Sequence, residues 1–153
     1  MKKIVSLLLS VVLVLGLFTA CGNNAETDTS LDTPRDTDEV YKVAIVQLVD
    51  NSAFTEMREA FINRMRALGY DEAKMTFDIY IYDWEKSEIY TICEGLKTAD
   101  YDLVVPIVTP ATIAVVNQEL SCPTVFISVT DPVSSGILTT MEAPDKNATG
   151  TSN

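Results

Sequence analysis

The sequence predicts an α/β fold, a three-layer domain in which a parallel sheet carries helices on both faces. Four short apolar segments, typical of strands, alternate with three segments of helical period along residues 41–129. Strands that alternate with helices form a parallel sheet through right-handed crossovers. We therefore expect the spatial strand order 2-1-3-4, with any fifth strand beyond the fourth.

The expected strands cover residues 41–49, 76–83, 102–108 and 123–129. The first, third and fourth are nearly continuous apolar runs, which are typical of strands covered on both faces. The second strand alternates, with Phe77, Ile79 and Ile81 on one face, so we expect it at an edge of the sheet. Pro106 lacks a backbone N–H and is expected near the C-terminal end of its strand or at a bulge.

The expected helices cover residues 52–69, 87–98 and 109–120. The first has an apolar stripe made of Phe54, Met57, Phe61, Met65 and Leu68. Gly69 stands where a helix commonly ends in a left-handed residue. Ser87 is the expected N-cap of the second helix. The third begins with Thr109 as the expected N-cap and Pro110 at the first helical position.

The N-terminal segment has the pattern of an export signal. Lys2 and Lys3 precede an apolar stretch, residues 4–18, that is shorter than the ~20 residues of a membrane span. The segment ends in "LFTAC", which resembles the lipobox of bacterial lipoproteins and implies acylation of Cys21. Ordinary signal cleavage with an accidental cysteine is the alternative.

The sequence suggests four parts: a signal peptide at 1–20, a flexible tether at 21–39, a folded lobe at 40–143, and a segment at 144–153. The tether is rich in Asp, Thr and Asn and has a single Leu, so it cannot bury enough apolar surface to order itself.

Charge and composition exclude several functions. The whole chain has a net charge of −11, and the two lysines lost with residues 1–20 would make it more negative. Nucleic acid is therefore not an expected partner, and membrane attachment would depend on lipid at Cys21. The chain has no histidine, which removes the commonest metal ligand and every histidine-activated nucleophile. We expect no metal site and no cofactor. Cys93 and Cys122 are expected as small buried side chains, with a disulfide as the alternative.

Ligands of parallel α/β sheets bind at the carboxyl ends of the strands. Three loops meet this condition: residues 49–54, 108–112 and 129–136. The candidate ligand-binding residues are Asp50, Asn51, Ser52, Phe54, Thr109, Pro110, Ala111, Thr112, Thr130 and Asp131.

Each loop also has a plain structural interpretation. In the first, polar side chains precede Phe54, which forms either an apolar wall for a ligand or part of the core. In the second, the helix N-terminus at Thr109 either binds a carboxylate or is an ordinary capped helix start without a ligand. In the third, Asp131 receives an ammonium group or caps the next turn.

No catalytic motif is present, because the sequence lacks GxGxxG, GxxxxGK[ST] and GxSxG. We therefore expect a protein that is not an enzyme. An aromatic-rich segment contains Tyr80, Tyr82, Trp84 and Tyr90. It is interpreted either as packing around an edge strand or as a partner surface.

Four stretches in the same order carry a family resemblance: "VAIVQLVDNSAFTEMREAFINRMRALGY", "DLVVPIVTPATIAVVNQ", "PTVFISVTDPVSSGIL" and "APDKNATGTSN". Together they resemble the substrate-binding lipoproteins of ABC transporters of the tryptophan/tyrosine-binding type. The resemblance implies the type I periplasmic-binding-protein fold, of which this chain holds one flavodoxin-like lobe. It also implies that residues 144–153 begin a strand leading to a second lobe that this chain lacks.

The resemblance further implies capture of a small solute, often an aromatic amino acid, outside the cell and its delivery to a permease and its ATPase. The candidate residues of the three loops match the positions that hold the ligand in that family. The alternative is a lipid-anchored interaction module with a flavodoxin-like fold and no enzymatic activity.

Overall fold

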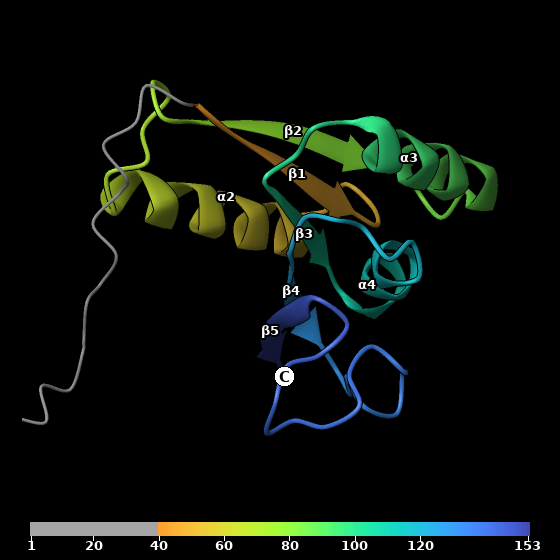
Figure 1. Cartoon of the computed structure of the whole chain (residues 1–153). Helices are drawn as coiled ribbons and strands as arrows, with labels where there is room; N and C mark the ends of the chain where they lie inside the picture. Colours follow the sequence, from red (N-terminus) through yellow and green to blue (C-terminus); the bar gives the residue numbers. More distant parts are fainter. Residues whose placement is uncertain (1–39) are drawn as a thin grey trace, which may run out of the picture. The chain divides into compact units, whose positions relative to one another are not determined.

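The computed structural model describes residues 40–153, so residues 1–20, the tether 21–39 and Cys21 lie outside the described residues. Helices and strands alternate up to the fourth strand, and a fifth strand follows (Figure 1). In chain order the elements are β1 (Tyr41–Gln47), α2 (Ser52–Ala67), β2 (Met75–Ile81), α3 (Lys86–Thr98), β3 (Leu103–Ile107), α4 (Thr109–Val116), β4 (Thr124–Val129) and β5 (Ala148–Ser152).

The five strands form one sheet in the order β2-β1-β3-β4-β5, and every neighbouring pair is parallel. The predicted order and the position of a fifth strand beyond the fourth are confirmed. β2 lies at an edge, as its alternating pattern predicts. The switch point, where the strand order reverses, lies at β1, beside both β2 and β3.

Alternate residues of β1 point to opposite faces of the sheet and join two separate cores. Val43 and Ile45 pack with α2, whereas Ala44 and Val46 pack with α3 and α4 (Figure 1). All four side chains are at most 1% exposed. A strand buried on both faces must be apolar at every position, which explains the continuous run in the sequence. The three-layer prediction is confirmed.

α2 ends in a Schellman motif at the predicted glycine. The Tyr70 N–H donates to the Met65 carbonyl oxygen at 3.0 Å, and the Gly69 N–H donates to that of Arg66 at 3.0 Å. Gly69 has φ 96°, a conformation that glycine adopts without a Cβ penalty. Leu68, the last residue of the predicted stripe, is the C-cap and remains 42% exposed.

Two predicted helix starts are wrong. The N-cap of α3 is Glu85, and Ser87 lies inside the helix, because a turn closed by the Glu85 N–H on the Tyr82 carbonyl oxygen at 2.7 Å starts the helix earlier. The N-cap of α4 is Val108, so Thr109 is already helical. α4 also ends at Val116, four residues before the predicted end.

Strand ends differ from the predictions by one or two residues. Pro106 is the penultimate residue of β3, as expected from its missing N–H. β4 carries an irregularity between Phe126 and Val129, where Ser128 has φ 59°. Within residues 40–153, no helix is long and apolar enough to cross a membrane.

Candidate functional site

The loop after β1 starts α2 through its own side chains. Asn51 is the N-cap, and its Oδ1 accepts a hydrogen bond from the Phe54 N–H at 2.8 Å. The Thr55 hydroxyl donates to Asp50 Oδ1 at 3.0 Å. Ser52 is exposed, and the half-buried Phe54 packs against the cores on both faces of the sheet. The loop therefore offers polar groups to solvent, while the Phe54 ring mainly serves the core.

The loop after β3 contains a strained residue. Val108 has φ 68° and ψ 164°, a region that is essentially restricted to glycine and costs of the order of 1–3 kcal/mol. Its neighbours hold it there. The Val108 N–H donates to the Ile127 carbonyl oxygen at 2.9 Å, and the Val108 carbonyl oxygen accepts from the Thr112 N–H and hydroxyl at 3.1 and 2.9 Å.

This conformation begins α4 directly after β3 and leaves backbone donors at its N-terminus. Pro110 has no N–H, and the Thr112 N–H is bonded to Val108. The N–H groups of Thr109 and Ala111 have no backbone acceptor within residues 40–153. Free N–H groups and the helix dipole together favour a bound anion such as a carboxylate.

The side chains of Ala111 and Thr112 point into the protein. Both residues are 0% exposed, and the Thr112 hydroxyl is used on Val108. Of the four candidate residues in this loop, only Thr109 brings a polar side-chain group near the edge. Ala111 is closed to solvent, backbone included, and Pro110 contributes an exposed ring.

The loops after β3 and β4 are joined by one hydrogen bond. The Thr130 N–H donates to Thr109 Oγ1 at 3.3 Å, so the Thr109 hydroxyl proton remains available to a ligand. Gln47 and Ile107, the last residues of β1 and β3, are paired, and the loop after β1 therefore starts beside this junction. No hydrogen bond joins residues 49–54 to the other two loops in the part of the chain that the structure describes.

Asp131 caps the turn that follows β4. Its Oδ1 accepts from the Ser134 N–H at 2.9 Å, and this hydrogen bond lowers the pKa of the Asp131 carboxyl below its usual value. The carboxylate is solvent-exposed. Asp131 therefore caps the turn, as one interpretation predicts, and its exposed carboxylate is accessible to an ammonium group.

Sequence reasoning missed a buried polar pair beneath the first loop. Gln47 is 0% exposed at the end of β1. Its Oε1 accepts from Arg58 Nη1 at 2.9 Å, and its Nε2 donates to the Val49 carbonyl oxygen at 2.8 Å. The pair fixes where the chain leaves the strand. A glutamine inside the apolar run "VAIVQLV" is the signal that would have revealed it, because buried polar groups require partners.

The described residues hold no cluster of acidic or thiol side chains suited to a metal. Cys93 and Cys122 are free thiols, and burial raises the pKa of both, that of Cys93 to about 11. The predicted disulfide alternative is wrong for this structure.

Comparison with known proteins identifies relatives of the same architecture. The chain is 29% identical over 155 residues to a tyrosine-binding protein of Clostridioides difficile, a match that covers 99% of this chain and 44% of that protein. The chain therefore spans less than half the length of this curated relative.

Solved structures agree on the fold. A ligand-free, open structure of a substrate-binding protein with adhesive properties from Clostridium difficile is 29% identical, with a TM-score of 0.70 over 74% of this chain and 39% of that one. A conserved domain protein from Vibrio cholerae is 30% identical, with a TM-score of 0.70 over 73% of this chain and 38% of that one. An ABC domain in complex with L-Trp from Streptococcus pneumonia, 23% identical, has a TM-score of 0.71 over 74% and 39% of the two chains.

A family model matches the folded region of the chain and shows its family. Residues 42–153 match the ABC transporter substrate-binding proteins, and that range includes every described helix and strand except the first residue of β1. The family binds substrates and is not enzymatic, which confirms the prediction that this chain is not an enzyme. The chain belongs to the ABC transporter substrate-binding protein family.

Proposed function

We propose that the carboxyl edge of the sheet binds an aromatic amino acid, and that the protein delivers it to an ABC permease and its ATPase. One observation carries the proposal. The Thr130 N–H to Thr109 Oγ1 bond joins two loops, so that donors for a carboxylate and the Asp131 carboxylate lie on adjacent loops. An α-amino acid presents the two complementary charges on one carbon. The ligand class is suggested by the tyrosine-binding relative.

In this arrangement the ligand carboxylate is held by the N–H and the hydroxyl of Thr109. The ammonium group is held by Asp131, which stays negative at neutral pH. Asp50 and Asn51 supply further polar contacts, and Phe54 borders the aromatic ring. The residues of these loops that are exposed to solvent include Asp50, Asn51, Pro110 and Asp131. Ligand groups therefore stay partly hydrated, and we expect affinity in the roughly millimolar range.

The test is a titration of the 153-residue chain with L-tyrosine, followed by amide NMR. We expect the largest shifts at the amides of Thr109 and Thr130. Tyramine lacks the carboxylate and 3-(4-hydroxyphenyl)propionate lacks the ammonium group, so each should shift these amides less. Equal shifts with all three ligands, or shifts located elsewhere, would contradict the proposal.

Asp131→Asn provides a matched variant, because Asn retains the capping acceptor but has no charge. It should reduce the preference for L-tyrosine over 3-(4-hydroxyphenyl)propionate by about two- to fivefold, which is the scale of an exposed ion pair. An unchanged preference would remove Asp131 from the site.

We also propose that the protein acts at the outer face of the cell membrane, held by lipid on Cys21. This proposal rests on the lysines, apolar stretch and "LFTAC" of the sequence. Residues 21–39 would then separate the folded lobe from the membrane.

A further inference from the structure

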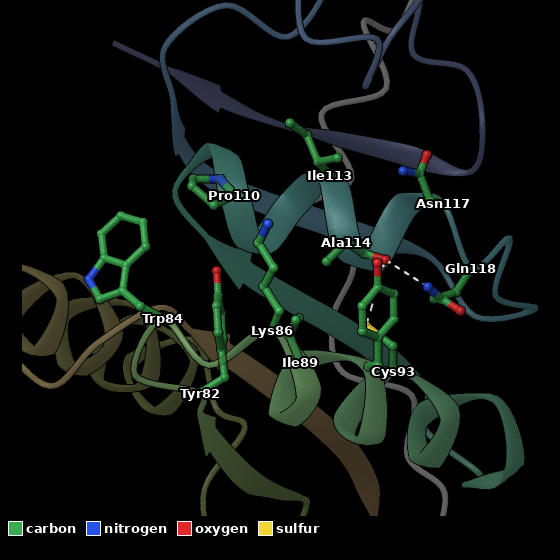
Figure 2. Close-up of a pocket in the computed structure, with 11 residues that line it drawn as sticks. Tyr82, Trp84, Lys86, Ile89, Cys93, Pro110, Ile113, Ala114, Asn117 and Gln118 are labelled. Atoms are coloured by element: carbon green, nitrogen blue, oxygen red, sulfur yellow. Dashed lines mark hydrogen bonds between the residues drawn. The ribbon is translucent and has the colours of Figure 1, made fainter.

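A groove between α3 and α4 lies beside the candidate edge and shares only Pro110 with the ten candidate residues. Its cavity volume is about 440 Å³, within the ~300–1,000 Å³ typical of small-molecule sites. Trp84 and Tyr82 lie at one end, and Asn117 and Gln118 lie at the other (Figure 2). The floor between them is apolar and is formed mainly by Ile89 and Ala114.

Tyr82 brings a polar group without a protein partner into this groove. The residue is only 5% exposed, and its ring packs in the core with α3. No group within residues 40–153 makes a hydrogen bond with its hydroxyl, yet the hydroxyl is not sealed from solvent. Figure 2 shows the hydroxyl directed into the space between α3 and α4. Burial of the ring, and then the nearby Cys93, raises the pKa of Tyr82 to about 12, so it presents a neutral hydroxyl at physiological pH.

Lys86 is the only charged residue that lines the groove. Its side chain points across the groove toward α4 (Figure 2), and it makes no ion pair in the described part of the chain. The chain as a whole is acidic. Asp83 and Glu85 flank Trp84 but do not line the groove, so the charge that faces a bound ligand is that of Lys86.

Two aromatic side chains at the opening of the groove are exposed to solvent. Trp84 is 65% exposed and Tyr90 is 68% exposed. Asp83 and Trp84 both have positive φ, 43° and 65°, which is uncommon for residues other than glycine. These two consecutive left-handed residues form the turn before α3 and place the indole at the end of the groove (Figure 2).

We propose that the α3–α4 groove binds a small aromatic carboxylate, with its ring between Trp84 and the apolar floor and its carboxylate accepting from both Lys86 and the Tyr82 hydroxyl. This groove shares only Pro110 with the candidate residues of the proposed function. Either site can be present without the other.

The experiment uses 3-phenylpropionate as the probe and the 153-residue chain at 150 mM salt. Trp84 is the only tryptophan in the chain, so its indole N–H gives a single NMR signal that reports on this groove alone. We expect that signal to shift saturably with 3-phenylpropionate. 3-Phenylpropanamide, which lacks the charge, and cyclohexylpropionate, which lacks the aromatic ring, should each bind several-fold more weakly.

Two variants test the assigned contacts. Tyr82→Phe retains the packed ring and removes only the hydroxyl, and we expect about three- to tenfold weaker binding. Lys86→Gln should weaken binding by about two- to fivefold and abolish the preference over the amide. Lys97→Gln is the matched control on the same helix, because Lys97 lies outside the groove and pairs with Glu94 at 3.1 Å; it should bind like the parent.

An unshifted Trp84 signal at 10-fold excess over a millimolar protein sample would overturn the proposal. Equal weakening by Lys86→Gln and Lys97→Gln would also overturn it, because the effect would then be one of overall charge. Thr109 and Thr130 amide shifts without a Trp84 shift would place the probe at the carboxyl edge instead.

Discussion

Val108 is the residue whose conformation the neighbouring contacts most clearly impose. A β-branched residue at φ 68° and ψ 164° is unfavourable by itself. It is retained because its N–H and carbonyl groups are bonded to β4 and to Thr112, and because its half-buried side chain packs between the two cores. The strained backbone is what lets α4 begin directly at the end of β3.

This strain should reverse the usual order of stability of alanine and glycine variants. We expect Val108→Gly to be about 1 kcal/mol more stable than Val108→Ala, because both lose the side-chain packing but only glycine relieves the strain. At Val115, inside α4, the order should be the ordinary one, with alanine more stable by about 1 kcal/mol. Urea unfolding of the four variants gives both differences. The same order at both positions would show that Val108 is not strained.

At the scale of elements, the attachment of β5 depends on a glycine. Gly150 lies against Phe126 of β4, and a Cβ on Gly150 would meet the Phe126 carbonyl oxygen and come within 2.5 Å of ring atom Cδ2. Gly150 pairs with Phe126, beside the irregularity of β4 between Phe126 and Val129. A close backbone approach of this kind is a common reason for glycine in a strand.

Gly150→Ala should therefore destabilise the protein by about 1–3 kcal/mol, the usual range for overpacking. Gly95→Ala in α3 is the matched control, because a Cβ there meets nothing within 4 Å. It should stabilise the protein by about 0.5–1 kcal/mol, since glycine is costly inside a helix. Unfolding free energies measure both changes. If Gly150→Ala is neutral, β5 does not pack on β4 as described.

At the scale of the whole molecule, the N-terminal proposal gives a prediction in cells. Cys21→Ser should move the protein from the membrane fraction to the soluble fraction, because stable anchoring requires acyl chains on that cysteine. Fractionation and the mass of the N-terminal peptide measure the outcome. Cys93→Ser is a control for thiol loss, and it should remain in the membrane fraction. Membrane retention of the Cys21 variant would contradict the lipoprotein proposal.

The sequence predicts most of the fold because its signals are repeated and local. Continuous apolar runs identify the buried strands, and the helix–strand alternation dictates parallel pairing and order. The start of α4 was mispredicted because it depends on the backbone conformation of Val108, which is set by contacts with β4 and not by local propensity. The start of α3 was missed for a similar reason, since a turn at Asp83 and Trp84 precedes it.

The candidate site is predictable only in part. The carboxyl-edge rule selects three loops, and the Thr109–Thr130 bond joins two of them. It cannot tell which side chains turn inward, as Thr112 does. It also cannot find a groove between two helices, because the residues of α3 and α4 that line it become neighbours only through packing.

The titratable side chains of the folded part, the buried thiol of Cys93 among them, have a consequence for how the protein responds to pH. Histidine is the only side chain whose ordinary pKa lies between about 5 and 8, and the chain has none. Burial moves the two described cysteine thiols further above that interval. Asp131 is moved in the opposite direction, away from it. The folded part is therefore expected to keep the same charge, and the same electrostatic attraction for its ligands, in mildly acidic and in neutral surroundings.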